Sequence, residues 1–363
     1  MATRPLLLAC GALALITAGW AGLGRIGVLP TAGLGSAAIY HGALMVSGFV
    51  GTLICLERAI VARRSWALLA PLCSALGAIG VILGAPQPLP ALAIAAAAVV
   101  LGTITLFGVT SSPRIAMAMM AAGAASWAAG ALLWATGAEP FRSVPWWAAF
   151  LVLTVAAERM ELSRAVRPSR GALVVFVAAT AVLVLGAAVT LLDFRLGLRV
   201  AGWALLVIAL WLALRDRPPA ASRAFPLPRY IGRAIAMAYA WLAVGALLML
   251  TYDGVPGTWR YDALVHSVFI GFVLTMIFAH GPIILPAIAG IAVTYRPLLY
   301  VPLVLLQSSV VLRIGGDIVE RADWRGWGAI TSAIAMLTFA VTMAFSARRR
   351  RQASSAALSA ARR

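Results

Sequence analysis

Residues 262–284 read DALVHSVFIGFVLTMIFAHGPII. After Asp262 the stretch contains no Asp, Glu, Lys or Arg, and it is long enough to cross a lipid bilayer as one helix, which takes roughly 20 residues. Two of the chain's three histidines, His266 and His280, lie inside it. Because an ionisable side chain within a membrane is costly, each histidine is expected to have a bonding partner or a function.

The composition of the whole chain indicates an integral membrane protein. Apolar residues make up 63% of it, charged residues 11%, and the mean hydropathy is +0.98. The net charge of +18 comes entirely from arginine, which lies mostly in short loops and the tail. That placement is typical of orientation in a bilayer and not of nucleic-acid binding. The three cysteines lie in apolar segments without the spacing of a zinc site or a disulfide framework.

Hydropathy predicts twelve membrane spans with approximate bounds 5–24, 34–56, 66–84, 89–110, 115–137, 144–163, 171–192, 197–214, 231–252, 262–284, 297–315 and 326–346. With the N-terminus inside, 21 of the 29 arginines fall on the inner side, as the positive-inside rule requires. The prediction is therefore an all-α polytopic bundle forming a single domain over residues 1–363. Both termini are expected in the cytoplasm of a bacterial cell, with a basic tail at 347–363.

An internal similarity links three of these spans. Gly48-Phe49-Val50-Gly51-Thr52 in the second span resembles Gly271-Phe272-Val273-Leu274-Thr275 in the tenth, and a weaker version surrounds Thr154 in the sixth. The spacing of four helices favours three four-helix units in a pseudo-threefold arrangement. Chance similarity between apolar helices is the alternative.

His41 and His266 are predicted at matched depth in the second and tenth spans. About seven and five residues from the outer ends of their predicted helices, both would lie roughly 8–10 Å below the outer surface. Two imidazoles in an apolar bundle are suited to axial ligation of one haem iron. The alternative is that each is a neutral histidine hydrogen-bonded to a neighbouring helix.

Three arginines near the last outer loop, Arg313, Arg321 and Arg325, are candidate partners for the two propionates of such a haem. Trp324 and Trp327 flank them. Tryptophan and arginine also anchor helices at the membrane interface, and this is the alternative.

A second group of ionisable residues is predicted near the inner face. Glu57, Glu158 and His280 could meet there as a proton-handling or ligand site, which would suit a proton-coupled transporter as the alternative function. The simpler interpretation pairs Glu57 with Arg58 and Glu158 with a neighbour such as Arg164.

Residues 41–49, His-Gly-Ala-Leu-Met-Val-Ser-Gly-Phe, resemble the His-rich segment of the NnrS family, which typically reads His-x-His-Glu-Met-x-x-Gly-Phe. His41 matches the first histidine, whereas Ala43 and Leu44 replace the second histidine and the glutamate. The run from His266 to Met276 is similar to a later segment of that family. NnrS proteins are membrane haem and copper proteins linked to nitric-oxide metabolism, so the resemblance also raises copper as a second, more weakly supported cofactor.

The arrangement of spans also resembles the catalytic subunit of haem-copper oxidases. That family has twelve spans, and its low-spin haem is held by histidines on helices two and ten, where His41 and His266 fall. Its copper ligands are histidines on helices six and seven, and a further histidine lies near the low-spin ligand on helix ten. This chain has no histidine in its sixth and seventh predicted spans.

These resemblances imply one low-spin haem b held by two histidines and no conventional oxygen-reducing centre. The implied role is electron transfer or the handling of nitric oxide or another small gas, with a redox partner and without nucleic acid. Whether the protein is an enzyme stays open at this point.

Overall fold

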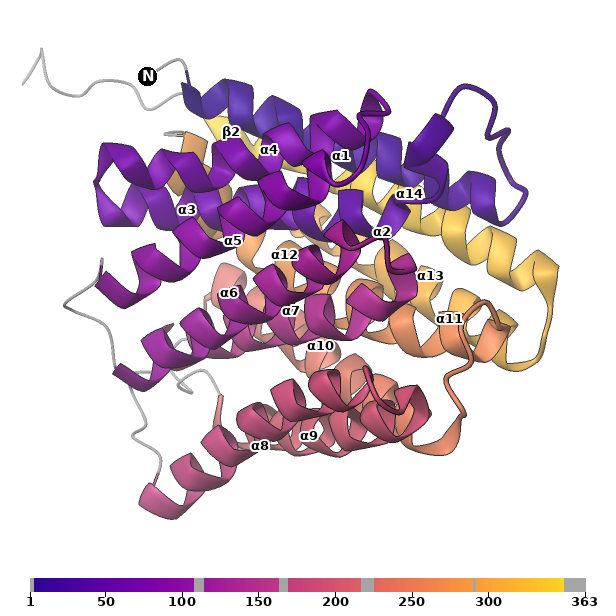
Figure 1. Cartoon of the computed structure of the whole chain (residues 1–363). Coiled ribbons are helices and arrows are strands. Elements are labelled where there is room, and N and C mark those ends of the chain that lie inside the picture. Colours follow the sequence, from indigo (N-terminus) through magenta and orange to yellow (C-terminus); the bar gives the residue numbers. More distant parts are fainter. Residues whose placement is uncertain (1–2, 108–113, 163–168, 217–224, 290–291, 349–363) are drawn as a thin grey trace, which may run out of the picture.

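A computed structural model describes residues 3–107, 114–162, 169–216, 225–289 and 292–348. Within these ranges, twelve helices are long and apolar enough to cross a membrane, which confirms the predicted all-α polytopic bundle (Figure 1). The larger apolar core runs from Ala14 to Met343 and includes residues of all twelve helices. The basic tail beyond residue 348 and Arg164 lie outside the described residues.

The spans have the following bounds. They are α1 (Thr3–Arg25), the second span α2–η2–α3 (His41–Ala43, Leu44–Gly51, Thr52–Ala62), η3–α4 (Ser65–Leu68, Leu69–Ile82), α5 (Leu89–Phe107), α6 (Arg114–Ala135), α7 (Pro140–Leu162), α8 (Arg170–Val189), α9 (Phe194–Arg215), α10 (Pro226–Thr251), the tenth span α11–η5–α12 (Trp259–His266, Ser267–Leu274, Thr275–Ala289), η6–α13 (Pro297–Leu299, Tyr300–Ile318) and α14 (Ala322–Ser346). A short antiparallel pair joins β1 (Ala292–Val293) to β2 (Ala347–Arg348).

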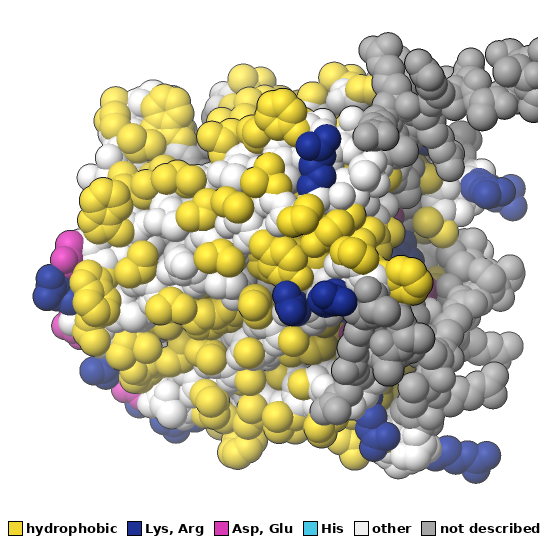
Figure 2. All heavy atoms as spheres, turned by 180° about the vertical axis from the view of Figure 1, so that it is seen from behind, with side chains coloured by type: hydrophobic (Ala, Val, Ile, Leu, Met, Phe, Trp, Pro, Cys, Tyr) yellow, Lys and Arg dark blue, Asp and Glu magenta, His cyan; other side chains and the backbone are white. Residues whose placement is uncertain are grey.

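The surface of the bundle suits a bilayer. Seen from behind (Figure 2), hydrophobic side chains cover most of the described surface, and acidic side chains gather with arginines at one end. Inside the bundle, small residues allow helices to approach closely. A Cβ added at Gly48 would lie 2.8 Å from the Ala78 Cβ atom and 2.9 Å from that of Ala14, so this glycine sets the spacing of the second span from α1 and α4.

The second span begins later than predicted. Residues 34–40, expected to be helical, contain the 3₁₀ turn η1 (Gly35–Ala38) and a non-helical Tyr40 with φ −97° and ψ 27°. Gly33 and Gly35 have φ of 85° and 48°, in the left-handed region that ends regular helix. The apolar character of this segment gave a helical hydropathy signal, but its glycines dictate a turn. His41 is therefore the first residue of its helix, and the span continues to Ala62.

Two spans change from α-helix to π-helix near the middle. The segments are η2 (Leu44–Gly51) and η5 (Ser267–Leu274), each of 8 residues. They fall on the two better-matched segments of the internal similarity, and in both a threonine follows the last π-helical residue, Thr52 and Thr275. The third segment, around Thr154, is regular α-helix within α7. Because π-helical turns are rare and often occur at functional sites, they direct attention to the region between the second and tenth spans.

Candidate functional site

A cavity of about 690 Å³ lies between α1, the second span, α7, the tenth span and α14. Its size is within the range of sites for cofactors and other small ligands, roughly 300–1,000 Å³. Both π-helical segments line it with apolar side chains: Met45, Val46, Phe49 and Val50 from η2, and Phe269, Ile270, Val273 and Leu274 from η5. His41 and His266 both line the same cavity, so the structure brings the two predicted ligands to one site.

His41 is held by α1. Its Nδ1 lies 2.6 Å from the carbonyl oxygen of Ala18. Ala18 is seven residues before Arg25, the last residue of α1, so the imidazole lies about 10 Å below that end of the helix. Gly22 leaves room for the ring, because a Cβ there would lie 2.8 Å from His41 Cε1. His41, the first residue of its helix, therefore lies beside the interior of α1 and not beside the end of that helix.

His266 is held by its own helix. Its Nδ1 lies 2.9 Å from the carbonyl oxygen of Asp262 and 3.3 Å from the Asp262 carboxylate. His266 is seven residues after Trp259, the first residue of α11, which corresponds again to about 10 Å of helix. Both histidines form their hydrogen bonds through Nδ1, and none to Nε2 of either ring is formed by the described residues. An Nδ1–H held by a carbonyl leaves Nε2 as a lone-pair donor, the usual state of a metal-ligating histidine.

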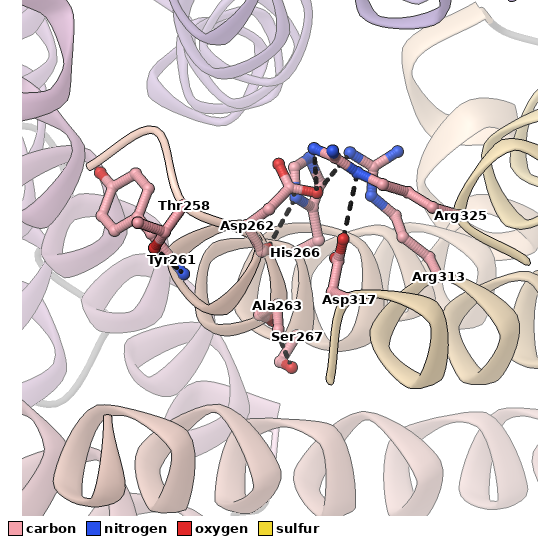
Figure 3. A network of polar contacts seen from close by, with 9 residues as sticks. All are labelled: Thr258, Tyr261, Asp262, Ala263, His266, Ser267, Arg313, Asp317 and Arg325. Atoms are coloured by element: carbon pink, nitrogen blue, oxygen red, sulfur yellow. Dashed lines mark hydrogen bonds and ion pairs between the residues drawn. The ribbon is translucent and has the colours of Figure 1, made fainter. Parts of the chain in front are cut away.

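Two of the three predicted arginines lie at the cavity. Arg313 pairs with Asp262 at 2.7 Å and Arg325 pairs with it at 3.2 Å, and both line the cavity. Arg325 also lies 3.1 Å from Asp317, whose side chain is 0% exposed. Figure 3 shows Asp262 between His266 and the two guanidinium groups. Arg321 is not part of this group: it is exposed and pairs with Asp323 at 2.8 Å.

Sequence reasoning missed Asp262 and Asp317 as members of the site. One signal was available for Asp262, which precedes His266 by four residues and therefore lies on the same face of a helix. The same signal was available for Asp317, which follows the predicted Arg313 by four residues on α13, whereas its ion pair with Arg325 of the next helix could not be predicted in this way.

At the opposite end of the bundle, the two predicted glutamates, Glu57 and Glu158, lie around Arg58 together with Glu161. The guanidinium lies 3.0 Å from Glu158, 3.2 Å from Glu161 and 3.7 Å from Glu57. The pairing of Glu57 with Arg58 is thus confirmed, and Glu158 shares the same partner. The arginine is 6% exposed, so this ion-pair cluster joins α3 to α7 inside the protein.

His280 does not join that cluster and lies in a separate network. Its Nδ1 donates to the carbonyl oxygen of Met276 at 2.8 Å, and its Nε2 lies 3.1 Å from Arg159 Nη1. Since arginine only donates, Nε2 must be the acceptor, and His280 is neutral. Arg159 binds both carboxylate oxygens of Asp216, at 2.6 and 2.9 Å, and the Tyr239 hydroxyl donates to the same carboxylate at 2.5 Å. Both ring nitrogens of His280 are therefore occupied.

Within the described chain, no group of three or more His, Cys, Asp or Glu side chains is arranged to hold a metal ion. Comparisons with known proteins identify the family of the chain. No curated protein matches the chain. A family model described as "Domain of unknown function (DUF8744)" matches residues 4–348. Because that match covers nearly the whole sequence, the chain belongs to this family.

Proposed function

We propose that the chain is an integral membrane protein that binds haem b through His41 and His266. Its role would be electron transfer or the handling of nitric oxide or another small gas. One observation carries the proposal: two histidines from different spans line one cavity, each with Nδ1 held by a backbone carbonyl and Nε2 without a partner in the described structure. Paired Nε2 atoms of this kind are suited to axial ligation of iron.

The polar end of the cavity supports the same ligand. Arg25, Arg313 and Arg325 line it together with Glu139 and Asp262, and Asp317, outside the lining, pairs with Arg325, so the three arginines are matched by three carboxylates in and beside the cavity. Two buried donors there, Arg313 Nε and Tyr261 Oη, have no hydrogen-bond partner among the described residues. Arginine and hydroxyl donors are suited to the carboxylates of haem propionates.

The remaining lining supports a flat apolar group. The side chains contributed by η2 and η5 are Met, Val, Phe, Ile and Leu, so these walls of the cavity are apolar. Burial of a porphyrin against such walls would contribute roughly 25 cal/mol for each Å² of apolar surface removed from water.

The membrane and the orientation that we propose follow from the distribution of arginines in the sequence. The protein would lie in the cell membrane of a bacterium with both termini in the cytoplasm, because 21 of its 29 arginines then face inward. The histidine pair would be at the periplasmic side, within reach of a redox partner. A conventional oxygen-reducing centre is not part of the proposal, since the third histidine is bound to Arg159.

A proton-coupled transporter is the second candidate. The cluster of Glu57, Glu158 and Glu161 around Arg58 is the observation in its favour, because buried carboxylates are frequent in proton pathways. It is the weaker candidate because His280, proposed to act with these residues, has both nitrogens engaged elsewhere.

The test is a spectrum of the protein purified in detergent from cells supplied with haem. We expect the reduced protein to show the sharp Soret and alpha bands of a six-coordinate haem b at one haem per chain. The double variant His41→Ala, His266→Ala should lose them. The matched control is His280→Gln, which removes the only other histidine while keeping an acceptor for Arg159, and it should retain them.

Two results would refute the proposal. One is a folded, monodisperse wild-type protein without haem despite adequate supply. The other is a full complement of haem in the double variant.

A further inference from the structure

The two candidate ligands are held with different strength. His266 lies within a continuous helical span, and its Nδ1 faces both the carbonyl and the carboxylate of Asp262. That carboxylate is itself fixed by Arg313 and Arg325 (Figure 3). A carboxylate behind a ligating imidazole fixes the ring and raises the basicity of its other nitrogen. His266 is therefore built as a firm ligand.

His41 lacks such support. Its hydrogen-bond partner within the described chain is one neutral group, the Ala18 carbonyl of another helix. It is the first residue of α2, and the preceding Tyr40 is not helical. A ring at the start of a helix is restrained by fewer backbone hydrogen bonds than one inside it. Moving His41 away from the cavity centre thus disturbs less structure than moving His266.

There is also space beside His41. Gly19 and Gly22 of α1 both line the cavity. A Cβ at Gly22 would touch the His41 ring, whereas a Cβ at Gly19 would meet no heavy atom within 4 Å. The residues that line the cavity next to His266 are larger, namely Val265, Phe269 and Ile270. The open volume on the α1 side is suited to a ligand of two or three atoms or to a displaced imidazole.

We infer that His41 is the displaceable ligand and that a neutral diatomic gas, such as carbon monoxide or nitric oxide, binds the iron on the α1 side. The inference rests on the proposed haem site. It assigns the fixed role to His266 and its carboxylate, and the exchangeable role to His41. It also makes gas binding compatible with a site in which both histidines are ligands at rest.

The experiment uses carbon monoxide as the probe on the full-length, reduced, haem-loaded protein. In the wild type we expect the observed binding rate to reach a plateau as carbon monoxide is raised, because departure of His41 limits it. In His41→Ala the haem should bind more weakly but be retained through His266 when haem is supplied in excess, and the rate should rise in proportion to the gas concentration. His266→Ala should lose most of its haem.

A second variant keeps both histidines. Gly19→Leu fills the open volume and should weaken carbon monoxide binding by roughly tenfold or more, as a steric misfit of a few methylenes does, without altering the spectrum of the gas-free protein. Its control is Gly19→Ala, which should change neither property.

Three results would overturn the inference while leaving the haem proposal intact. In the first, the wild-type haem does not bind carbon monoxide. In the second, His266→Ala retains haem and binds the gas, whereas His41→Ala does neither. In the third, Gly19→Leu binds the gas as tightly as the wild type. Absence of haem from the wild type would instead refute the proposed function itself.

Discussion

Gly22 and Gly19 lie one turn apart on α1 and provide a matched pair of substitutions. Replacing either by alanine in a helix favours folding by about 0.8–1 kcal/mol from backbone propensity alone. The new methyl group at position 19 would meet no atom within 4 Å. At position 22 it would lie 2.8 Å from Cε1 and 3.2 Å from Nδ1 of His41. The two variants thus differ mainly in what they do to one imidazole.

The size of the effect follows from those distances. Ordinary van der Waals contact begins at 3.4 Å, so the new methyl group in Gly22→Ala must displace the His41 ring by about 0.6 Å. A displacement of that size stretches the 2.6 Å hydrogen bond from the ring to the Ala18 carbonyl toward the long limit of such bonds. Losing that bond costs about 1 kcal/mol, which offsets the helical gain. Net stability should hardly change. Haem affinity should fall by about tenfold, because the partner that orients a ligand is disturbed.

The assay has two parts. Thermal unfolding in detergent measures stability of the haem-free chain, and titration with haem followed by absorbance measures affinity. Gly19→Ala should be slightly stabilised with unchanged haem affinity, while Gly22→Ala should keep wild-type stability and bind haem more weakly. Equal haem affinity in the two variants would show that His41 does not ligate the iron, and the assignment of this ligand would fail.

Three further predictions concern the polar networks. Asp262→Asn should lower haem affinity about 10–100-fold with the fold intact, measured by haem titration; unchanged affinity would contradict its role behind His266. Arg159→Met should destabilise the chain by about 3–5 kcal/mol, because it removes the guanidinium that binds both oxygens of a buried carboxylate. Tyr239→Phe should cost less, about 1.5–3 kcal/mol for one hydrogen bond to a charged group. Thermal unfolding would show this order, and equal losses would argue against it. Arg321→Ala should leave stability and haem content unchanged, since the side chain is exposed, while Arg325→Ala should lower haem content. A larger loss of haem in Arg321→Ala than in Arg325→Ala would mean that the wrong arginine has been assigned to the cavity.

Much of the architecture could be predicted because hydrophobic length is a strong signal. The twelve spans follow from runs of about 20 apolar residues, and the part of the chain that the structure describes contains twelve such helices. The start of the second span could not be predicted from hydropathy, because Gly33 and Gly35 turn the chain within an apolar stretch. The π-helical segments were also beyond reach, since their residue types are those of ordinary apolar helix.

The candidate site was partly predictable for a similar reason. Histidines in apolar spans are rare enough to be noticed, and the structure places both His41 and His266 at one cavity. Which arginine lies beside them depends on the turn between α13 and α14, where Arg321 precedes the helix and Arg325 lies inside it. The network around His280 joins α7, α10, α12 and the end of α9, and only the assembled fold brings these residues together.

The π-helical segment of the second span has a consequence for the relation between the two ends of the molecule. Each residue of an α-helix rotates the chain by about 100° about the helix axis, and each residue of a π-helix, which has more residues per turn, rotates it by less. His41 faces the cavity and Arg58 faces the acidic cluster of α7, and η2 lies between them. If the same residues of η2 formed regular α-helix, everything beyond them would be rotated about the helix axis. The imidazole and the guanidinium could then not both face their present partners, so this stretch of backbone keeps two distant polar centres in phase.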